Sequence, residues 1–372
     1  MRITFILSNI PNPRNNKRIK AFAEFAEVDV ICTRRLNMDV CPLDSYQNVN
    51  YHVMDIEVPT VNHLFKRALA FWRFYRFCKS ILKKLEPDII YLCGLDNLLI
   101  ASASVLEKTK ICYEVADLRE SYTNHHNTLS MRSVFDTTVK WIEEKLSHNV
   151  SLLVVTSIKF YENHYNKLFE KEQVIEVPNM PNLAAFDHYK PKEGGEFTIG
   201  FVGGIRYVEQ MKMLVDAAKE ADVKVIFSGA SLDKDSRLIS YCTDKPWVTF
   251  TGRFDFMKDI AGIYGKIDCV YSVYDASNFN VRIALPNKLY EAVVAEIPII
   301  VANNTYLGQL VNEWGTGICI DYNDKHALVE VLNKLKSKGD YYAQFVANCK
   351  QKKTDIDVAM YLKRLCARIQ NL

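Results

Sequence analysis

Residues 198–206 read Thr-Ile-Gly-Phe-Val-Gly-Gly-Ile-Arg and join a short apolar run to a glycine bend. The run is followed by a helical pattern at residues 213–218, so the stretch predicts a buried strand, a tight turn and a helix. Glycines let the backbone approach a phosphate closely and point N–H groups at it. We therefore expect a strand–turn–helix unit of an α/β domain with an anion site at its turn.

The same alternation of apolar run and helical pattern continues outward in both directions. Runs of this kind, buried on both faces and separated by helices, predict parallel sheets. The strand candidates are residues 3–7, 28–32, 89–93, 110–114 and 152–155 in the first half, and 198–202, 224–228, 248–251, 269–272, 297–301 and 317–320 in the second.

The chain has 372 residues, which suits two domains better than one core. The stretch VPNMPN at residues 177–182 disfavours both helix and strand because it holds two prolines. We therefore predict two Rossmann-like α/β domains, residues 1–180 and 181–354. Residues 355–372 are predicted to form a C-terminal helix that packs back towards the first domain.

Composition excludes several classes of protein. Hydrophobic residues make up 49% and charged residues 24%, and the net charge of +3 is too small to indicate a nucleic-acid partner. None of the ten cysteines forms a C-x-x-C pair, which favours a reducing compartment. Residues 1–7 show no signal peptide, and no apolar run reaches the ~20 residues of a transmembrane helix. We expect a cytoplasmic protein.

Residues 285–301 read LPNKLYEAVVAEIPIIV and carry the most specific pattern in the chain. Lys288 and Glu291 are three residues apart, so both lie on one face at the start of a helix. A carboxylate there can accept hydrogen bonds from a ribose diol, and a lysine suits a diphosphate. The stretch resembles the donor-site signature of GT-B glycosyltransferases in the GT4-like (group 1) family of bacterial surface polysaccharide biosynthesis, which includes capsule and O-antigen assembly.

Two further stretches extend this resemblance over nearly the whole chain. Residues 199–206 resemble the opening of the C-terminal, donor-binding domain, and residues 91–99 with 111–118 resemble the strand ends that line the acceptor side. The resemblance implies the GT-B fold, two Rossmann-like domains with a cleft between them. It also implies a retaining transfer without metal, and no cofactor besides the nucleotide diphosphate sugar.

Specific residues follow from these matches. The predicted donor-binding residues are Gly203, Gly204, Arg206, Arg282, Lys288 and Glu291, and the predicted acceptor-side residues are Asp96, Asp117 and Arg119. The catalytic candidates are Asp117, which would orient the acceptor, with Arg206 and Lys288, which would stabilise the leaving diphosphate. One departure stands out, because the family has a second glutamate eight positions before Glu291 and this chain has Ile283 there.

Other interpretations of these residues stay open. Glu291 could belong to the exposed face of an amphipathic helix, Asp117 could cap the helix that follows it, and a loop arginine such as Arg206 is usually solvated. Asp355-Ile356-Asp357 matches a D-x-D metal motif, but a charge at a helix N-terminus explains it as well. We expect no metal.

The segment HLFKRALAFWRFYRFCKSILKKL at residues 63–85 is basic, aromatic and free of acids. A helix of this composition can lie in an anionic membrane interface, and part of its wide apolar arc must also be buried in the domain. The predicted membrane-contacting residues are Lys66, Arg67, Arg73, Arg76, Lys79, Lys83 and Lys84. They place the protein in the cytoplasm or on the inner face of the membrane.

The sequence as a whole predicts a hexosyl- or related glycosyltransferase. It would move a sugar from a UDP- or GDP-sugar to a saccharide acceptor that is free or carried on a lipid. Ile283 leaves a second class open, a catalytically degenerate nucleotide-sugar-binding partner in a polysaccharide assembly complex. A sugar-nucleotide epimerase of the same architecture is the third alternative.

Overall fold

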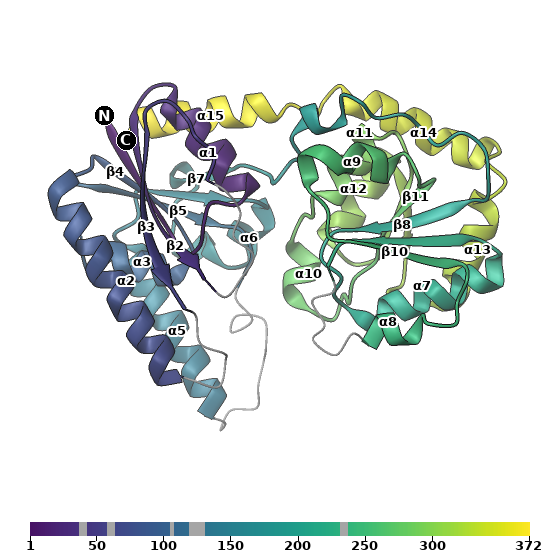
Figure 1. Ribbon diagram of the computed structural model, residues 1–372, viewed down its shortest axis with the longest axis horizontal. Coiled ribbons are helices and arrows are strands. Elements are labelled where there is room, and N and C mark those ends of the chain that lie inside the picture. The colour runs from purple at the N-terminus through teal and green to yellow at the C-terminus, as the bar shows by residue number, and fades with distance from the viewer. Residues whose placement is uncertain (37–42, 58–63, 105–107, 119–130, 231–236) are drawn as a thin grey trace. The chain divides into compact units, whose positions relative to one another are not determined.

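The computed structural model describes residues 1–36, 43–57, 64–104, 108–118, 131–230 and 237–372. The chain divides into two compact units. The first unit comprises Met1–Pro178 together with Ala359–Leu372, and the second comprises Asn179–Val358 (Figure 1). Both units are α/β domains, and every strand pair described in their sheets is parallel.

The first unit is built on a seven-stranded sheet of order β3-β2-β1-β4-β5-β6-β7. Its strands are β1 (Arg2–Leu7), β2 (Glu27–Arg35), β3 (Val49–Ile56), β4 (Ile89–Cys93), β5 (Lys110–Val115), β6 (Leu152–Val155) and β7 (Val174–Glu176). Its helices are α1 (Pro13–Ala23), α2 (Leu64–Leu85), α3 (Leu95–Ser102), α5 (Met131–Ser147), α6 (Ile158–Asn163) and α15 (Val358–Gln370), with 3₁₀ turns at Tyr165–Lys167 and Lys171–Gln173.

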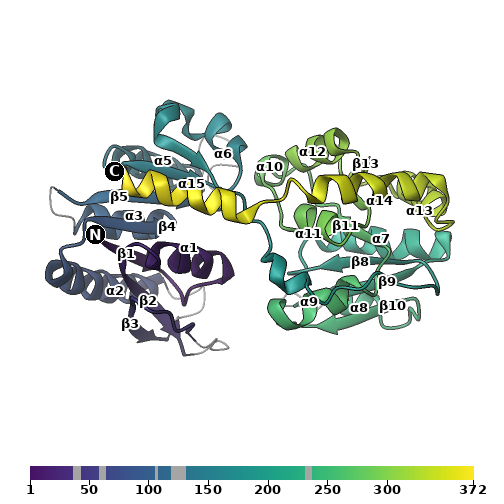
Figure 2. The same ribbon diagram turned by 90° about the horizontal axis from the view of Figure 1, so that it is seen from above.

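Helices cover both faces of the first sheet (Figures 1 and 2). α1 and α15 lie on one face, and α2, α3 and α5 lie on the other. The core beneath α1 and α15 is formed by alternate strand residues such as Phe5, Val30 and Tyr91, packed on Phe22 and Leu365. Burial on both faces explains the nearly continuous apolar runs of these strands.

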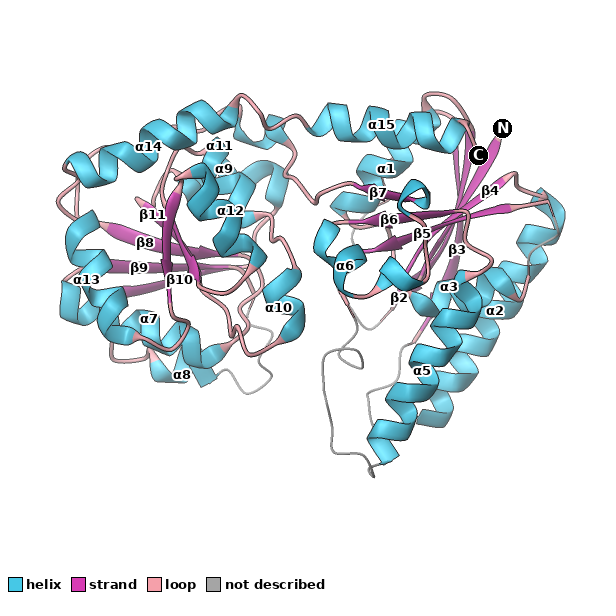
Figure 3. Cartoon of the chain, turned by 180° about the vertical axis from the view of Figure 1, so that it is seen from behind, coloured by secondary structure: helices cyan, strands magenta, loops and turns pink. Residues whose placement is uncertain are grey.

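The second unit has a six-stranded sheet of order β10-β9-β8-β11-β12-β13 (Figure 3). Its strands are β8 (Thr198–Val202), β9 (Lys224–Ser228), β10 (Val248–Gly252), β11 (Cys269–Ser272), β12 (Ile299–Ala302) and β13 (Gly317–Ile320). Its helices are α7 (Val208–Ala221), α8 (Arg237–Tyr241), α9 (Phe256–Tyr264), α10 (Phe279–Ile283), α11 (Lys288–Val294), α12 (Tyr306–Trp314), α13 (Lys325–Leu335) and α14 (Asp340–Lys353), with a 3₁₀ turn at Leu183–Phe186.

Two strands escaped the sequence prediction. β3 pairs with β2 along its whole length, yet most of its residues are only half-buried. It lies at the edge of the sheet and mixes polar with apolar residues, so it shows no continuous apolar run. β7, at the opposite edge, has only three residues and is too short to leave a pattern.

The C-terminal helix α15 belongs to the first unit, although the residues before it belong to the second. Leu365 and Ile369 are fully buried in the core shared with α1. The helix begins at Val358, so Asp355 and Asp357 precede it, and Asp355 forms an ion pair with Lys352 at 3.0 Å. The return of the chain therefore completes one face of the first sheet.

Leu365→Ala should lower the free energy of unfolding of the first unit by about 2–5 kcal/mol, because it opens a cavity in a closed core. Urea unfolding followed by circular dichroism measures the loss. Met360→Ala on the same helix is the matched control, since Met360 is exposed and should cost less than about 1 kcal/mol. Equal losses in the two variants would show that α15 does not complete this core.

Candidate functional site

The order of strands in the second sheet marks one position for a ligand. From β8 the chain moves to β9 and β10 on one side, and it then crosses to β11 on the other side of β8. Ligands of open parallel sheets bind outside the carboxyl ends of the strands at such a switch point. The residues that follow β8 and β11 therefore form the first place to look for a site.

The side chain of Lys288 lies at this switch point. Its Nζ donates a hydrogen bond to the hydroxyl of Tyr274, which follows β11, at 2.8 Å. It also lies 4.5 Å from the centre of the Phe201 ring of β8. Lys288 is 9% exposed, and no carboxylate of the described residues lies within ion-pair distance of it. A buried ammonium without a counter-charge is costly, so this arrangement suits an anionic ligand.

The glycine bend after β8 lies directly beneath this ammonium. Gly203 has φ of +121°, and a Cβ placed on it would lie 3.1 Å from Nζ of Lys288. The neighbouring turn after β9 comes equally close, because a Cβ on Gly229 would lie 1.9 Å from the carbonyl oxygen of Gly203. Glycine is required at both positions, and the small residues leave the end of β8 open to Lys288.

Helix α7 follows the bend and contributes a second anion-attracting feature. Its N-cap residue Tyr207 has φ of +56°, an uncommon conformation for a non-glycine residue, and no side chain caps the helix. The Tyr207 ring packs on the ring of Tyr274 at 5.4 Å, which places the start of α7 next to the partner of Lys288. The first N–H groups of a helix favour an anion.

Glu291 lies on the same short helix as Lys288 and is also buried. Its Oε2 accepts a hydrogen bond of 2.7 Å from the hydroxyl of Tyr264 at the end of α9. Burial and the nearby Glu291 carboxylate raise the pKa of Tyr264 well above its ordinary value, so the hydroxyl stays a donor. The structure therefore excludes the interpretation of Glu291 as a solvated residue on an exposed helix face.

The other predicted donor-binding residues lie in different settings. Arg206 and Gly204 are exposed next to the bend, and no carboxylate of the described chain pairs with Arg206. Arg282 instead donates to the carbonyls of Ala276 and Ser277 at 3.0 and 2.9 Å. These two carbonyls are hydrogen-bond partners for the Arg282 guanidinium within the protein itself.

Ile283, the position that holds an acid in the resembling family, is 6% exposed at the end of α10. A carboxylate at this buried position would need a partner.

The first sheet has its own switch point, between β1 and β4, and a charged cluster lies beside it. The centre of the cluster is Glu114 at the end of β5, which is fully buried. Its Oε1 lies 3.1 Å from Nε of Arg14 and 3.4 Å from Nη2 of Arg18. Its Oε2 accepts a 2.5 Å hydrogen bond from the hydroxyl of Tyr91 on β4. The cluster ties α1 to β4 and β5.

The charge of Glu114 is set by these neighbours. Burial alone would raise the pKa of Glu114, but the positive charges of Arg18 and Arg14 and the hydrogen bond from Tyr91 hold it below its ordinary value. The carboxylate is therefore ionised, and it balances one of the two guanidinium charges. Arg14 also reaches the Cys93 sulfur at 3.6 Å, at the end of β4.

One predicted acceptor-side residue, Asp117, lies near this cluster. Asp117 follows β5, is exposed, and contributes to raising the pKa of Arg14, so its charge lies close to that guanidinium. Asp96 is exposed in the first turn of α3, and the N-cap of that helix is Gly94. Arg119 lies outside the described residues.

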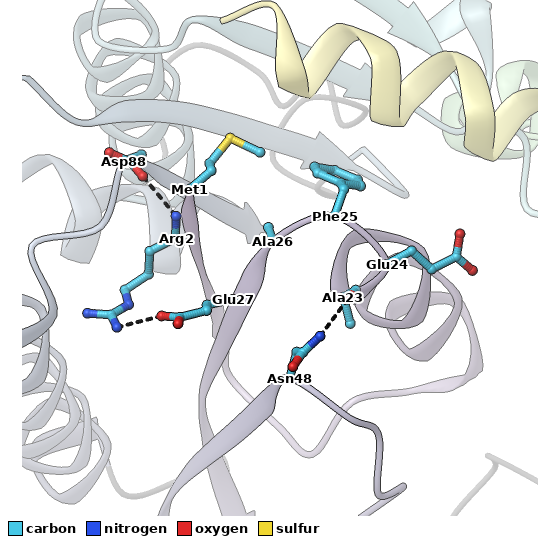
Figure 4. Close-up of a pocket in the computed structure, with 9 residues that line it drawn as sticks. All are labelled: Met1, Arg2, Ala23, Glu24, Phe25, Ala26, Glu27, Asn48 and Asp88. Carbon is cyan, nitrogen blue, oxygen red and sulfur yellow. Dashed lines mark hydrogen bonds and ion pairs between the residues drawn. The ribbon is translucent and has the colours of Figure 1, made fainter.

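A hollow of about 540 Å³ lies at the other end of the first sheet (Figure 4). Its walls include Arg2 at the start of β1, Glu27 at the start of β2 and Asp88 just before β4. Arg2 pairs with Glu27 at 2.6 Å, and its backbone N–H donates to Asp88 at 2.8 Å. Because Arg2 is paired with Glu27 and the hollow lies at the amino ends of the strands, we do not assign it to the site.

Metal ligands do not gather in the described part of the chain, where no group of three or more His, Cys, Asp or Glu residues is placed to hold an ion. None of the described helices is long and apolar enough to cross a membrane.

Sequence reasoning missed Tyr274, Tyr264, Arg14 and Arg18. Glu114 gave a usable signal, since it is the single charge inside the apolar run ICYEV at residues 111–115. Arg14 and Arg18 are four residues apart on α1 and so face one way. The tyrosines carry no comparable pattern, because only the packing of α9 and β11 against α11 brings their hydroxyls to Glu291 and Lys288.

Comparison with known protein families identifies a domain in the second unit. Residues 185–352 match the family of glycosyl transferases group 1. No curated protein matches the chain by sequence alone. Residues 185–352, which lie in the second unit, are therefore identified as a group 1 glycosyl transferase domain.

Solved structures extend the likeness to both units. Sucrose-phosphate synthase from Thermosynechococcus elongatus has a TM-score of 0.77 at 14% identity, over 100% of this chain and 98% of that chain. HepE from Anabaena in complex with UDP and glucose has a TM-score of 0.72 at 14% identity over 100% of both chains. WaaG, a glycosyltransferase of lipopolysaccharide biosynthesis, has a TM-score of 0.71 at 14% identity over 98% of both chains. The chain therefore has the GT-B fold.

Gly203→Ala should weaken binding of UDP or GDP at least about tenfold, because the variant strains a positive φ and crowds Lys288. Isothermal titration calorimetry measures the affinity. Gly262→Ala in α9 is the control, since a Cβ there meets nothing within 4 Å and should stabilise the helix by about 0.5–1 kcal/mol. Unchanged nucleotide affinity in Gly203→Ala would show that the bend does not contact the ligand.

Glu114→Gln should lower the free energy of unfolding by about 3–5 kcal/mol, because the buried guanidinium of Arg18 and the partly buried one of Arg14 lose their counter-charge. The lowered pKa of Glu114 in the folded state means that its contribution is present above its unfolded pKa and is lost as pH falls through the folded value.

Urea midpoints measured from neutral pH down to acid should therefore fall less steeply in Glu114→Gln than in the unmodified protein. Glu24→Gln, which changes an exposed carboxylate of the same unit, should leave both the midpoint and its pH dependence nearly unchanged. Parallel pH profiles for all three proteins would contradict the role assigned to Glu114.

Proposed function

We propose that the protein transfers a sugar from a nucleoside diphosphate sugar to a saccharide acceptor. The observation that carries the proposal is the buried ammonium of Lys288, which lies at the carboxyl end of β8 without a carboxylate partner in the described residues. A diphosphate supplies the missing negative charge. The UDP and UDP-glucose named with the HepE structures, at 14% identity, support a donor of this class.

In this proposal the second unit binds the donor. Gly203 and Gly204 let the diphosphate approach the backbone, and the start of α7 adds N–H donors. Lys288, together with Arg206 from the loop after β8, stabilises the negative charge that develops on the leaving diphosphate as the sugar bond breaks. Glu291 accepts hydrogen bonds from the ribose hydroxyls, held in orientation by Tyr264. The transfer is retaining and needs no metal, as the family resemblance implies.

The first unit binds the acceptor in this proposal. Asp117 and Asp96 are exposed at the carboxyl ends of β5 and β4, where they can accept hydrogen bonds from sugar hydroxyls. Asp117 orients the hydroxyl that attacks the donor. The acceptor is a saccharide that is free or carried on a membrane lipid, and anionic membrane is an expected partner of the basic helix α2.

A catalytically degenerate nucleotide-sugar-binding protein is the second candidate, favoured by one observation. Ile283 places a buried apolar side chain where the resembling family has an acid. Incubation with UDP- and GDP-sugars and a saccharide acceptor distinguishes the two candidates. Release of free UDP or GDP together with a larger saccharide identifies a transferase, whereas donor binding without release identifies the degenerate partner.

Lys288→Met should abolish the rise in melting temperature that UDP or GDP causes in the unmodified protein. Methionine keeps an unbranched apolar stem but removes the charge that attracts the diphosphate. Because the buried cation has no carboxylate partner in the described chain, its removal should leave the apo melting temperature equal or higher. Differential scanning fluorimetry with UDP, GDP, ADP and their sugars measures both quantities.

Lys334→Met is the matched control, because Lys334 is exposed on α13 of the same unit. This variant should keep the full nucleotide-dependent shift. A Lys288→Met protein that stays folded and still responds to a nucleoside diphosphate like the unmodified protein would remove the assignment of the donor site.

A further inference from the structure

The solvent-facing side of α2 carries a stripe that is apolar in the first half of the helix. Phe65, Leu69 and Trp72 are 82%, 46% and 50% exposed. They are separated by four and three residues, so they lie along one side of the helix. Side chains of this size are normally buried, and a contiguous exposed row of them indicates an interaction surface.

The same stripe becomes cationic in the second half of α2. Arg76, Lys79 and Lys83 continue the spacing of four, three and four residues after Trp72, and all three are exposed. The Arg76 guanidinium lies over the Trp72 ring at 5.0 Å, where the two halves of the stripe meet.

The opposite side of α2 is the one that packs on the sheet. Phe74, Cys78 and Leu82 are buried, and their spacing of four residues places them on the far side of the helix from the stripe. The exposed apolar row is therefore not the helix's contact with its own domain.

Helix α5 adds a second exposed apolar row that the sequence did not suggest. Val134, Phe135 and Trp141 are 66%, 65% and 57% exposed. Val134 and Trp141 are seven residues apart and so lie on the same side of the helix.

The second half of α5 is firmly attached to the first unit. Glu143 is buried, and it accepts hydrogen bonds from the hydroxyls of Tyr113 on β5 and Tyr165 at 2.6 and 2.9 Å. These bonds fix the orientation of α5 and hence the side on which its exposed residues lie.

The two helices present their apolar rows from one layer. α2, α3 and α5 cover the same face of the first sheet, and both long helices begin at the same end of that layer (Figures 1 and 3). The short helix α3 contacts both of them. Because α3 has only eight residues, it is much shorter than its neighbours on either side.

We propose that the exposed sides of α2 and α5 together form a docking surface for an anionic lipid bilayer. The apolar side chains insert below the headgroups, and the cations of α2 contact lipid phosphates. Docking would bring the first unit to a lipid-linked acceptor, and only this role of the surface rests on the proposed function. Docking itself requires neither donor nor acceptor.

Charge decides in favour of a bilayer over a protein partner. α2 has seven exposed basic residues and no acid, and none of the seven pairs with a carboxylate in the described part of the chain. Tryptophan and phenylalanine next to lysine and arginine are the residues that amphipathic helices use in a membrane interface. A surface of lipid phosphates supplies the extended negative charge that this row of cations requires.

Flotation of the full chain with vesicles tests the proposal. The chain should float with phosphatidylcholine vesicles that contain about 30% phosphatidylglycerol and remain unbound with phosphatidylcholine alone. The α5 variant Phe135→Ser/Trp141→Ser should lower the partition coefficient at least about tenfold. Replacing Arg76, Lys79 and Lys83 with glutamine should lower it similarly and weaken its dependence on salt.

Ile239→Ser provides the matched control, because Ile239 is an exposed apolar residue of α8 in the second unit. It should leave partitioning unchanged. All variants change exposed side chains, and unchanged melting temperatures confirm that each is folded.

A second measurement reports on α5 directly. In a Trp72→Phe background, brominated lipids should quench the fluorescence of Trp141, and the further change Trp141→Phe should remove the quenched component. Absence of flotation, or flotation without quenching of Trp141, would overturn the two-helix surface. Capture of the chain by an acidic protein without vesicle binding would overturn the bilayer as its occupant. None of these results would alter the nucleotide-binding test of Lys288→Met.

Discussion

Parallel pairing of the strands is the constraint on which the rest of the structure depends. Every described strand pair runs in the same direction, so the carboxyl ends of all strands in a unit lie at one edge of its sheet. Each sheet also reverses its strand order once, beside β1 in the first unit and beside β8 in the second. Loops from distant parts of the sequence therefore meet at two defined points.

The two switch points each contain a buried charge, and the neighbours of that charge differ between them. In the first unit the Glu114 carboxylate is balanced by Arg14 and Arg18 and also accepts a hydrogen bond from Tyr91, so the cluster ties α1 to β4 and β5. In the second unit the Lys288 ammonium has a tyrosine hydroxyl and a phenylalanine ring as neighbours. A phenylalanine ring and a neutral hydroxyl stabilise a cation less than a carboxylate does, which leaves room for an anionic substrate to do so.

Glycine and tyrosine residues have different structural roles around Lys288. Gly203 and Gly229 bring two loops closer than any side chain permits, which exposes the end of β8 to the ammonium. The Tyr274 hydroxyl accepts a hydrogen bond from Lys288, and the Tyr264 hydroxyl donates one to Glu291. The rings of both tyrosines pack within the domain and so fix the positions of these hydroxyls. Pre-oriented side chains of this kind avoid the cost of ordering them when a ligand binds.

The sequence by itself determined the α/β class, the central strands and the glycine bend, because burial on both faces produces apolar runs that local chemistry reveals. It also drew attention to Lys288 and Glu291, through the resemblance of residues 285–301 to a family signature. The half-exposed edge strand β3 left no such run. The tertiary structure alone decided that Tyr274 meets Lys288, that Arg14 and Arg18 meet Glu114, and that Phe135 and Trp141 stay exposed. These contacts and exposures depend on crossovers between distant strands and on which side of a helix faces the sheet. The local pattern of residues along the chain did not reveal them.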